Sequence, residues 1–218
     1  MSHASPEETS ARLHFPGVRA PKPLLSPEAL RRLTARQWEL LDELNELVVA
    51  EGLADLTMAQ IAARVNCSLR TLYGIAPSKD ELVLAVVDRR LHRIGRRAIG
   101  SLDPSLPPLE VLRSYLRAVN EAVQPETSSF SRDFANTPGA RRLLDSHEDY
   151  VIAVTRSLLE RAVAEGDAPP VDTAALAHVL GGLGREFSRP ELAELAAASP
   201  KATADAIADI ILRGLGRG

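Results

Sequence analysis

The 218-residue sequence has a formal net charge of −3 at pH 7, with 45 % hydrophobic and 25 % charged residues. This composition is ordinary for a globular protein and excludes a chain that is disordered throughout. At roughly 150 residues per domain, the length predicts one large domain or two small ones. The slightly acidic balance argues against non-specific coating of nucleic acid, and the aromatic content of 4 % argues against a stacking platform for single strands.

Cysteine and hydropathy indicate the compartment. Cys67 is the single cysteine, so an internal disulfide and a cysteine-based zinc site are both excluded. No run of 18 or more apolar residues predicts a membrane span, and the first twenty residues lack the apolar core of a signal peptide. We therefore expect a cytoplasmic protein that carries no metal and no cofactor.

In chain order, the first predicted element is an arm. Residues 1–27 are polar and rich in proline, which predicts a flexible segment whose Arg12, Arg19 and Lys22 either contact DNA or are solvated. Beyond it the hydrophobic periodicity is helical, and no run alternates as a strand would. The expected helices span 34–51, 58–65, 69–75, 78–101, 109–123, 127–136, 139–165, 172–188 and 200–214, with a short turn over 190–197.

Two short capped helices stand out over residues 57–75. Thr57 and Ser68 are the expected N-caps, because their hydroxyls can accept the free N–H groups of a first turn. The turn between the helices holds Asn66 and Cys67, and asparagine tolerates the left-handed conformation better than most residues. This layout is that of a helix-turn-helix, whose second helix enters the major groove of DNA. Leu72 is expected to point inward, whereas Arg70, Thr71 and Tyr73 face outward.

Over about residues 34–86 the sequence resembles the TetR family of bacterial transcriptional regulators. The matching residues are Thr57, Ile61-Ala62, Ser68, Thr71-Leu72-Tyr73 and Ser78-Lys79-Asp80-Glu81-Leu82. Two positions depart from the family pattern. Asn66 stands where the pattern has a turn glycine, and Ala76 stands where it has a core aromatic, for which Trp38 or Ile75 must compensate.

The resemblance implies an all-α fold in which a helix joins two domains. The flexible arm covers 1–27 and a three-helix helix-turn-helix DNA-binding domain covers 28–78. A C-terminal helical ligand-binding and dimerisation domain covers 79–218, and residues 79–101 form the connecting helix.

The resemblance also implies roles in DNA binding. Thr57, Tyr73 and Lys79 would hold phosphates, together with the backbone N–H groups behind Ser68. Arg70 would read a guanine, although a solvated Arg70 and a Tyr73 that packs in the core remain alternatives. The full set of expected DNA contacts is Thr57, Ser68, Leu69, Arg70, Thr71, Tyr73, Gly74 and Lys79. Within it, Leu69 would touch a thymine methyl, Thr71 a base edge or a phosphate, and Gly74 would let the backbone approach closely.

Two late helices have apolar stripes and small residues that fit a dimer interface. Glycine is costly inside a helix, so packing or a bend must explain Gly181, Gly182 and Gly184. The residues expected at the interface are Leu176, Val179, Leu180, Leu183, Ile207, Ile210 and Ile211. The alternative is that both helices pack only within the chain.

TetR-like proteins usually carry a ligand pocket in this domain, and ligand binding releases them from DNA by a population shift. The candidate lining residues are Leu116, Asn120, Phe130, Phe134, His147, Tyr150, Val151, Val154 and His178. They include few charged groups, which predicts an apolar or weakly polar effector. For each residue singly, a place in the core or on the surface is the alternative.

We therefore expect a homodimeric, sequence-specific transcriptional regulator, most simply a repressor that a small molecule releases from a palindromic operator. The alternative is a helix-turn-helix adaptor that binds a protein rather than DNA, against which Thr57, Thr71, Tyr73 and Lys79 argue. We expect no enzyme and no catalytic residues. The run His147-Glu148-Asp149-Tyr150 points in several directions on a helix, and no phosphate loop or nucleophile elbow is present.

Overall fold

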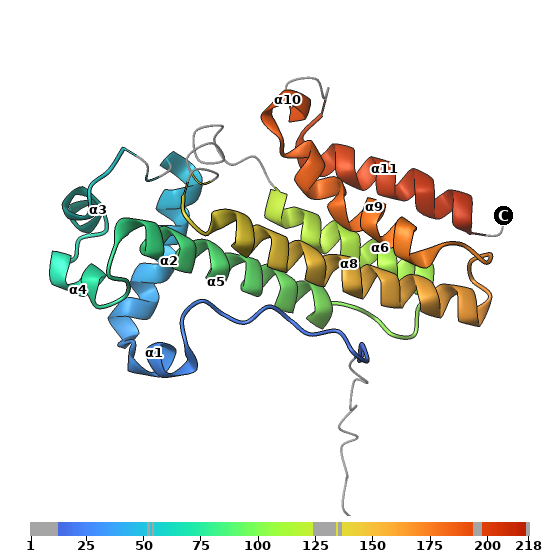
Figure 1. The fold of residues 1–218 in the computed structure, drawn as a ribbon, viewed down its shortest axis with the longest axis horizontal. Coiled ribbons are helices and arrows are strands. Elements are labelled where there is room, and N and C mark those ends of the chain that lie inside the picture. The colour runs from blue at the N-terminus through green and yellow to red at the C-terminus, as the bar shows by residue number, and fades with distance from the viewer. Residues whose placement is uncertain are drawn as a thin grey trace, which may run out of the picture.

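The computed structural model describes residues 13–51, 53, 55–123, 134, 137–193 and 198–216. Within these residues all regular elements are helical, which confirms the expected all-α class (Figure 1). Their order is α1 (Pro27–Arg32), α2 (Ala35–Glu51), α3 (Met58–Arg64), α4 (Leu69–Tyr73), α5 (Lys79–Gly100), α6 (Pro108–Val119), the 3-10 helix η1 (Asn120–Val123), α8 (Ala140–Glu165), α9 (Thr173–Phe187), α10 (Pro190–Ala193) and α11 (Pro200–Leu215). Of the helix expected over 127–136, only Phe134 belongs to the described residues.

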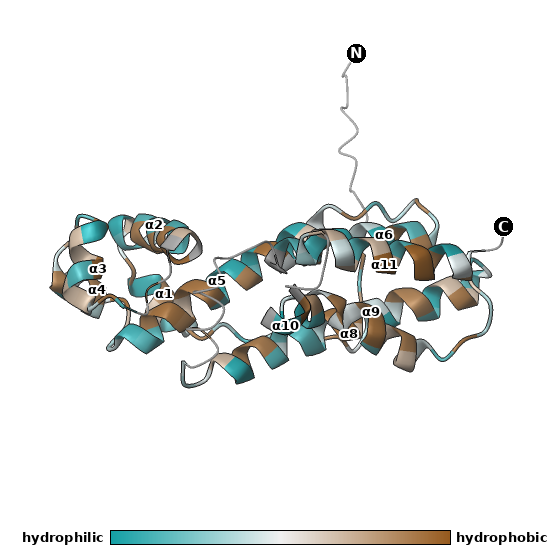
Figure 2. Cartoon of the chain, turned by 90° about the horizontal axis from the view of Figure 1, so that it is seen from above, coloured by the Kyte–Doolittle hydropathy of each residue, from teal (hydrophilic) through white to brown (hydrophobic). Residues whose placement is uncertain are grey.

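The helices form two groups that share α5. Figures 1 and 2 show α1–α4 at one end of the molecule and α6, α8, α9 and α11 at the other, with α5 running between them. One apolar cluster joins α2, α3 and α4 to the first half of α5, and it includes Leu44, Leu72 and Leu82. A second cluster joins α6, α8, α9 and α11, and it includes Leu112 and Leu158. The helix that carries the small N-terminal core therefore also packs against the larger one.

The segment before α1 lies along α5 rather than extending away from the fold (Figure 1). Leu13, Phe15 and Val18 pack against the second cluster, and the Leu24 N–H donates to Oδ2 of Asp88 over 2.9 Å. Of the arm expected over residues 1–27, the described residues 13–26 pack in this way, and residues 1–12 lie outside the described residues. The reason is that the few apolar side chains of this proline-rich segment are removed from water by packing against the second cluster.

Side-chain caps explain where the short helices begin. Thr57 and Gln60 form a reciprocal capping box at α3, and the hydroxyls of Ser68 and Ser78 accept the N–H groups of Thr71 and Glu81 at α4 and α5. Asn66, with a φ of 45°, supplies the left-handed turn between α3 and α4. Local sequence therefore sets the geometry of this pair of helices.

A glycine allows α9 to pack closely against α8. A Cβ atom on Gly181 would lie 2.8 Å from Cγ1 of Ile152 and 3.2 Å from its Cα. The next residue, Gly182, has more room, because a Cβ atom there would meet only Oε1 of Glu148 at 3.4 Å. Close packing therefore explains Gly181, one of the three glycines that are unfavourable within a helix.

We expect Gly181→Ala to lower the free energy of unfolding by about 1 kcal/mol, because overpacking of about 1–3 kcal/mol outweighs the gain of about 1 kcal/mol in helix propensity. Gly182→Ala is the matched control and is expected to be neutral or stabilising. Urea denaturation of the three proteins measures both changes. Equal effects of the two substitutions would show that close packing of α8 and α9 is not the reason for Gly181.

Within the residues that the structure describes, no helix is both long enough and apolar enough to cross a membrane.

Candidate nucleic-acid interface

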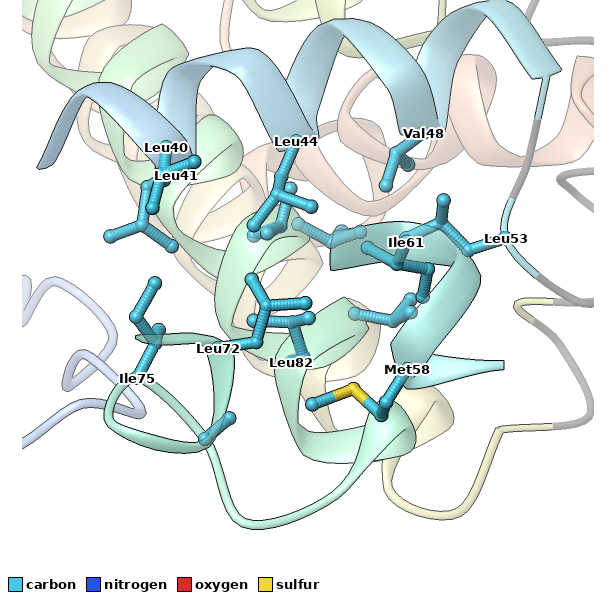
Figure 3. Packing of buried hydrophobic residues seen from close by; sticks show 14 of the residues in the cluster. Leu40, Leu41, Leu44, Val48, Leu53, Met58, Ile61, Leu72, Ile75 and Leu82 are labelled. Carbon is cyan, nitrogen blue, oxygen red and sulfur yellow. The ribbon is translucent and has the colours of Figure 1, made fainter. Parts of the chain in front are cut away.

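The core of the N-terminal group holds α4 in place (Figure 3). Leu40, Leu41 and Leu44 project from α2 toward Ile61 of α3 and Leu72 of α4, and all five side chains are fully buried. Ile75 and Ala76, which follow α4, are buried in the same cluster. A helix of five residues would not be stable in water by itself, so this packing determines its position.

The opposite face of α4 is exposed. Leu69 and Tyr73 are 39 % and 50 % exposed, and Arg70 on the same helix is exposed as well. Arg70 therefore lies on the surface, and Tyr73 does not fill the core. Exposed leucine, arginine and tyrosine on one short helix form a surface that can contact base edges and phosphates.

The hydroxyl groups of this region already make contacts within the protein. Oγ of Ser68 and Oγ1 of Thr71 lie 2.7 Å apart, and Thr71 is only half-exposed. Oγ1 of Thr57 takes part in the capping box with Gln60. Lys79, also half-exposed, extends Nζ toward the carbonyl oxygen of Leu53 over 3.5 Å. These side chains are thus oriented by their own helix ends.

Gly74 has a packing role that its sequence position did not reveal. Its φ of −73° is available to any residue, but a Cβ atom there would lie 2.8 Å from Nε2 of Gln37 and 3.2 Å from the carbonyl oxygen of Thr71. The glycine therefore allows α2 to lie close to the end of α4.

Two residues pack at the position where the family pattern has an aromatic and this chain has Ala76. Ile75 and Ala76 are buried together, and Trp38 packs partly against the same cluster. The guanidinium of Arg89 lies 4.5 Å from the centre of the Trp38 ring and also bonds to Asp42 of α2 over 3.1 Å. These contacts attach α2 to α5 beyond the apolar core.

The family model "Bacterial regulatory proteins, tetR family" matches residues 40–86, which extend from α2 through α3 and α4 into α5. Over 150 residues the chain is 28 % identical to the HTH-type transcriptional repressor KstR of Rhodococcus jostii strain RHA1, covering 66 % of this chain and 67 % of that protein. Residues 40–86 thus match the N-terminal domain of the tetR family of bacterial regulatory proteins. Members of this family are DNA-binding transcriptional regulators, which are not enzymes.

Solved structures of TetR-like regulators share the fold. A transcriptional regulator of Cytophaga hutchinsonii ATCC 33406 has a TM-score of 0.65 at 14 % identity, covering 84 % of this chain and 100 % of that chain. The complex of AibR with isovaleryl coenzyme A and operator DNA has a TM-score of 0.56 at 18 % identity. The match covers 80 % of this chain and 97 % of the AibR chain. The arrangement of a small N-terminal helical group and a larger C-terminal one is thus that of TetR-like proteins.

A cavity of about 600 Å³ lies between α5, α8 and the segment before α1. Of the residues predicted to line a pocket, His147 and Tyr150 line this cavity. The other residues that line the cavity are Leu13, Ala20, Pro21, Leu91, His92, Gly95, Arg96, Ile99, Gly100 and Leu102. Sequence analysis did not predict the α5 residues of the cavity wall, because it gave residues 79–101 only a connecting role. The spacing of His92 and Arg96, one helical turn apart, is the signal that could have indicated this face of α5.

The remaining predicted pocket residues lie elsewhere, and Phe130 is outside the described residues. Leu116 and Val154 are buried in the second cluster, against which Val151 packs. Asn120 is buried and donates to Oδ1 of Asp205 over 2.8 Å. Phe134 is buried in the first cluster together with Leu143 of α8, where the two helical groups meet. His178 is exposed on α9, away from the cavity wall.

Burial shifts the protonation of the groups at the cavity. It lowers the pKa of His92, with smaller contributions from His147 and Arg96 in the same direction and an opposing one from Asp88. Burial also raises the pKa of Tyr150. Both shifts favour the uncharged forms of these two side chains, whereas Arg96 places a cation at the same cavity.

The residues predicted for a dimer interface divide into three sets by exposure. Val179 on α9 and Ile210 on α11 are 50 % and 69 % exposed in the single chain. Leu180 is buried within the chain, where α9 packs against its neighbours. The partly buried members are Leu176, Leu183, Ile207 and Ile211.

Proposed function

We propose that the protein is a homodimeric, sequence-specific transcriptional repressor that a small apolar or weakly polar ligand releases from a palindromic operator. The observation that carries the proposal is the exposed face of α4, a helix whose buried Leu72 fixes its orientation. Leu69 and Tyr73 are exposed on this helix together with Arg70, so apolar, aromatic and cationic groups are available to one partner. The helix-turn-helix geometry directs this face to a major groove.

Each exposed side chain has a role that follows from its chemistry. Arg70 donates to O6 and N7 of a guanine, and Leu69 contacts a thymine methyl group. Tyr73 and Lys79 contact phosphates on either side of the groove. The capping residues Thr57, Ser68 and Thr71 contact the backbone with hydroxyls or with the N–H groups that they orient, and Gly74 supports α4 through Gln37.

Ligand control is proposed to act through α5. The helix begins at the N-terminal core, where Leu82 is fully buried, and Leu91, Gly95 and Ile99 in its second half line the cavity. A ligand that binds better to one position of α5 shifts the population toward that position. In the similar AibR structure, isovaleryl coenzyme A and operator DNA are present together, which supports a fold that binds both kinds of partner.

The exposed apolar residues of α9 and α11 are proposed to meet those of a second copy. We expect the double substitution Val179→Asp and Ile210→Asp to convert a dimer into a monomer, because it places charges in an interface that excludes water. Leu106→Asp is the matched control, since Leu106 is 41 % exposed outside these helices. Sedimentation equilibrium measures the state of each protein. A monomeric wild type, or a dimeric double variant, would contradict this interface.

Selection of genomic DNA fragments by the purified protein tests the function. The expected result is enrichment of a few fragments that share a palindrome with half-sites about one helical turn or more apart. Absence of any enriched fragment, with co-purification of a protein partner instead, would favour the adaptor alternative.

A further inference from the structure

Three side chains with metal-binding chemistry converge at the wall of the cavity. Asp88 and His92 lie one turn apart on α5, and His147 comes from α8, 59 residues from Asp88. Their candidate ligand atoms all lie within 4.8 Å of one another. Oδ1 of Asp88 is 3.2 Å from Nε2 of His147 and 3.4 Å from Nε2 of His92. Sequence analysis predicted no metal site, because His147 is far along the chain from Asp88 and His92.

We propose that Asp88, His92 and His147 form a binding site for a divalent transition-metal ion. Two imidazole nitrogens and one carboxylate oxygen suit zinc and its neighbours in the periodic table, whereas calcium and magnesium prefer oxygen ligands. With metal–ligand bonds of about 2.0–2.1 Å, neighbouring ligand atoms of a tetrahedron lie about 3.4 Å apart. Both Asp88–His distances are close to that value, and the three candidate ligand atoms lie within 4.8 Å of one another.

The surroundings hold the carboxylate in place. Asp88 is 3 % exposed, and its second oxygen, Oδ2, accepts the Leu24 N–H over 2.9 Å. This hydrogen bond leaves Oδ1 directed at the two imidazoles. Hydrogen bonds of this kind from neighbouring groups orient the ligands of natural metal sites. Here they attach the segment before α1 to the proposed site.

His92 provides a separate indication of a missing partner. Its Nε2 atom is buried and has no hydrogen-bond partner among the described residues, although it lies near Oδ1 of Asp88. Buried polar atoms without a partner are rare, and each calls for an explanation. A bound cation would satisfy this nitrogen. The alternative is a metal-free cluster in which Asp88 only orients the two rings.

The site would keep an open coordination position. His92 and His147 also line the cavity, so a fourth ligand there is a water molecule or a donor atom of a molecule bound in the cavity. The ion would join α5 to α8 near the Leu24 contact. Metal binding does not depend on the proposed DNA binding, and it is measured without DNA.

The test uses the full chain without an affinity tag, freed of metal by a chelator and titrated with Co²⁺ and Zn²⁺. We expect one ion per chain, cobalt absorption bands typical of low coordination number, and displacement of cobalt by zinc. His92→Gln and His147→Gln are each expected to bind at least about tenfold more weakly. His178→Gln is the matched control, because it removes an exposed histidine of α9, and it should bind as the wild type does.

Two outcomes would overturn the proposal. One is a wild type that binds neither ion, and the other is unchanged binding in the His92 and His147 variants. Circular dichroism shows whether the variants fold. A second readout needs no variant, because an ion that binds only the folded chain must raise the melting temperature of the wild type. A melting temperature that does not change with saturating Zn²⁺ would favour the metal-free cluster.

Discussion

Leu72→Ala is expected to lower the free energy of unfolding by about 2–5 kcal/mol, the range for removing a buried leucine side chain. Leu72 is fully buried. Among the residues of α4, all of which the structure describes, it is the only buried one. Its side chain packs among residues of α2, α3 and α5 (Figure 3). The substitution therefore leaves a cavity and also removes the attachment of α4. Chemical denaturation followed by circular dichroism measures the change.

Leu69→Ala is the matched control, three residues earlier on the same helix. Leu69 is 39 % exposed, so its truncation is expected to change the free energy of unfolding by no more than about 0.5 kcal/mol. If the two leucine variants were equally destabilised, α4 would not be held by the core as described. Both variants are expected to weaken DNA binding, Leu72→Ala through loss of the helix position and Leu69→Ala through loss of one base contact.

Arg70→Ala is expected to weaken binding to the selected operator by about 1–3 kcal/mol, while binding to a scrambled duplex falls much less. Arg70 is exposed on α4 between Leu69 and Tyr73, and a guanidinium there can pair with a single guanine. Removal of a base contact relaxes the preference at one base pair of each half-site. Equilibrium binding to the operator, the scrambled duplex and single-base variants measures these changes.

Tyr73→Phe distinguishes a phosphate contact from a base contact. Tyr73 is half-exposed, so loss of its hydroxyl is expected to weaken binding to both duplexes by a similar factor and to leave stability unchanged. If Arg70→Ala also reduced both affinities equally, then Arg70 would contact phosphates rather than a base.

The helix-turn-helix could be predicted because its determinants are local. Thr57 and Ser68 lie next to the helices that they cap, and the structure places both caps as the pattern predicts. Asn66 provides the left-handed turn residue within the same short segment. The end of α4 is less predictable, since the helix ends at Tyr73 rather than at the expected residue 75.

The cavity and the metal-ligand cluster could not be predicted, because they depend on contacts between distant parts of the chain. The packing of residues 13–26 along α5 brings Leu13 and Pro21 to the cavity, and no local pattern indicates this. His147 meets Asp88 only because α8 crosses α5. Phe134 is an apolar aromatic residue of the kind expected in a ligand pocket, yet it is buried where the two helical groups meet. The DNA contacts and the dimer interface stay predictions.

The most direct test compares the affinity of the wild-type protein for its selected operator with its affinity for a scrambled duplex of equal length, at the same salt concentration. A sequence-specific regulator is expected to prefer the operator by a factor of about 10³ or more. The preference should persist when salt is raised, although both affinities fall as counterions compete for the phosphates. Equal affinities for the two duplexes at every salt concentration would contradict the proposal that α4 reads a DNA sequence.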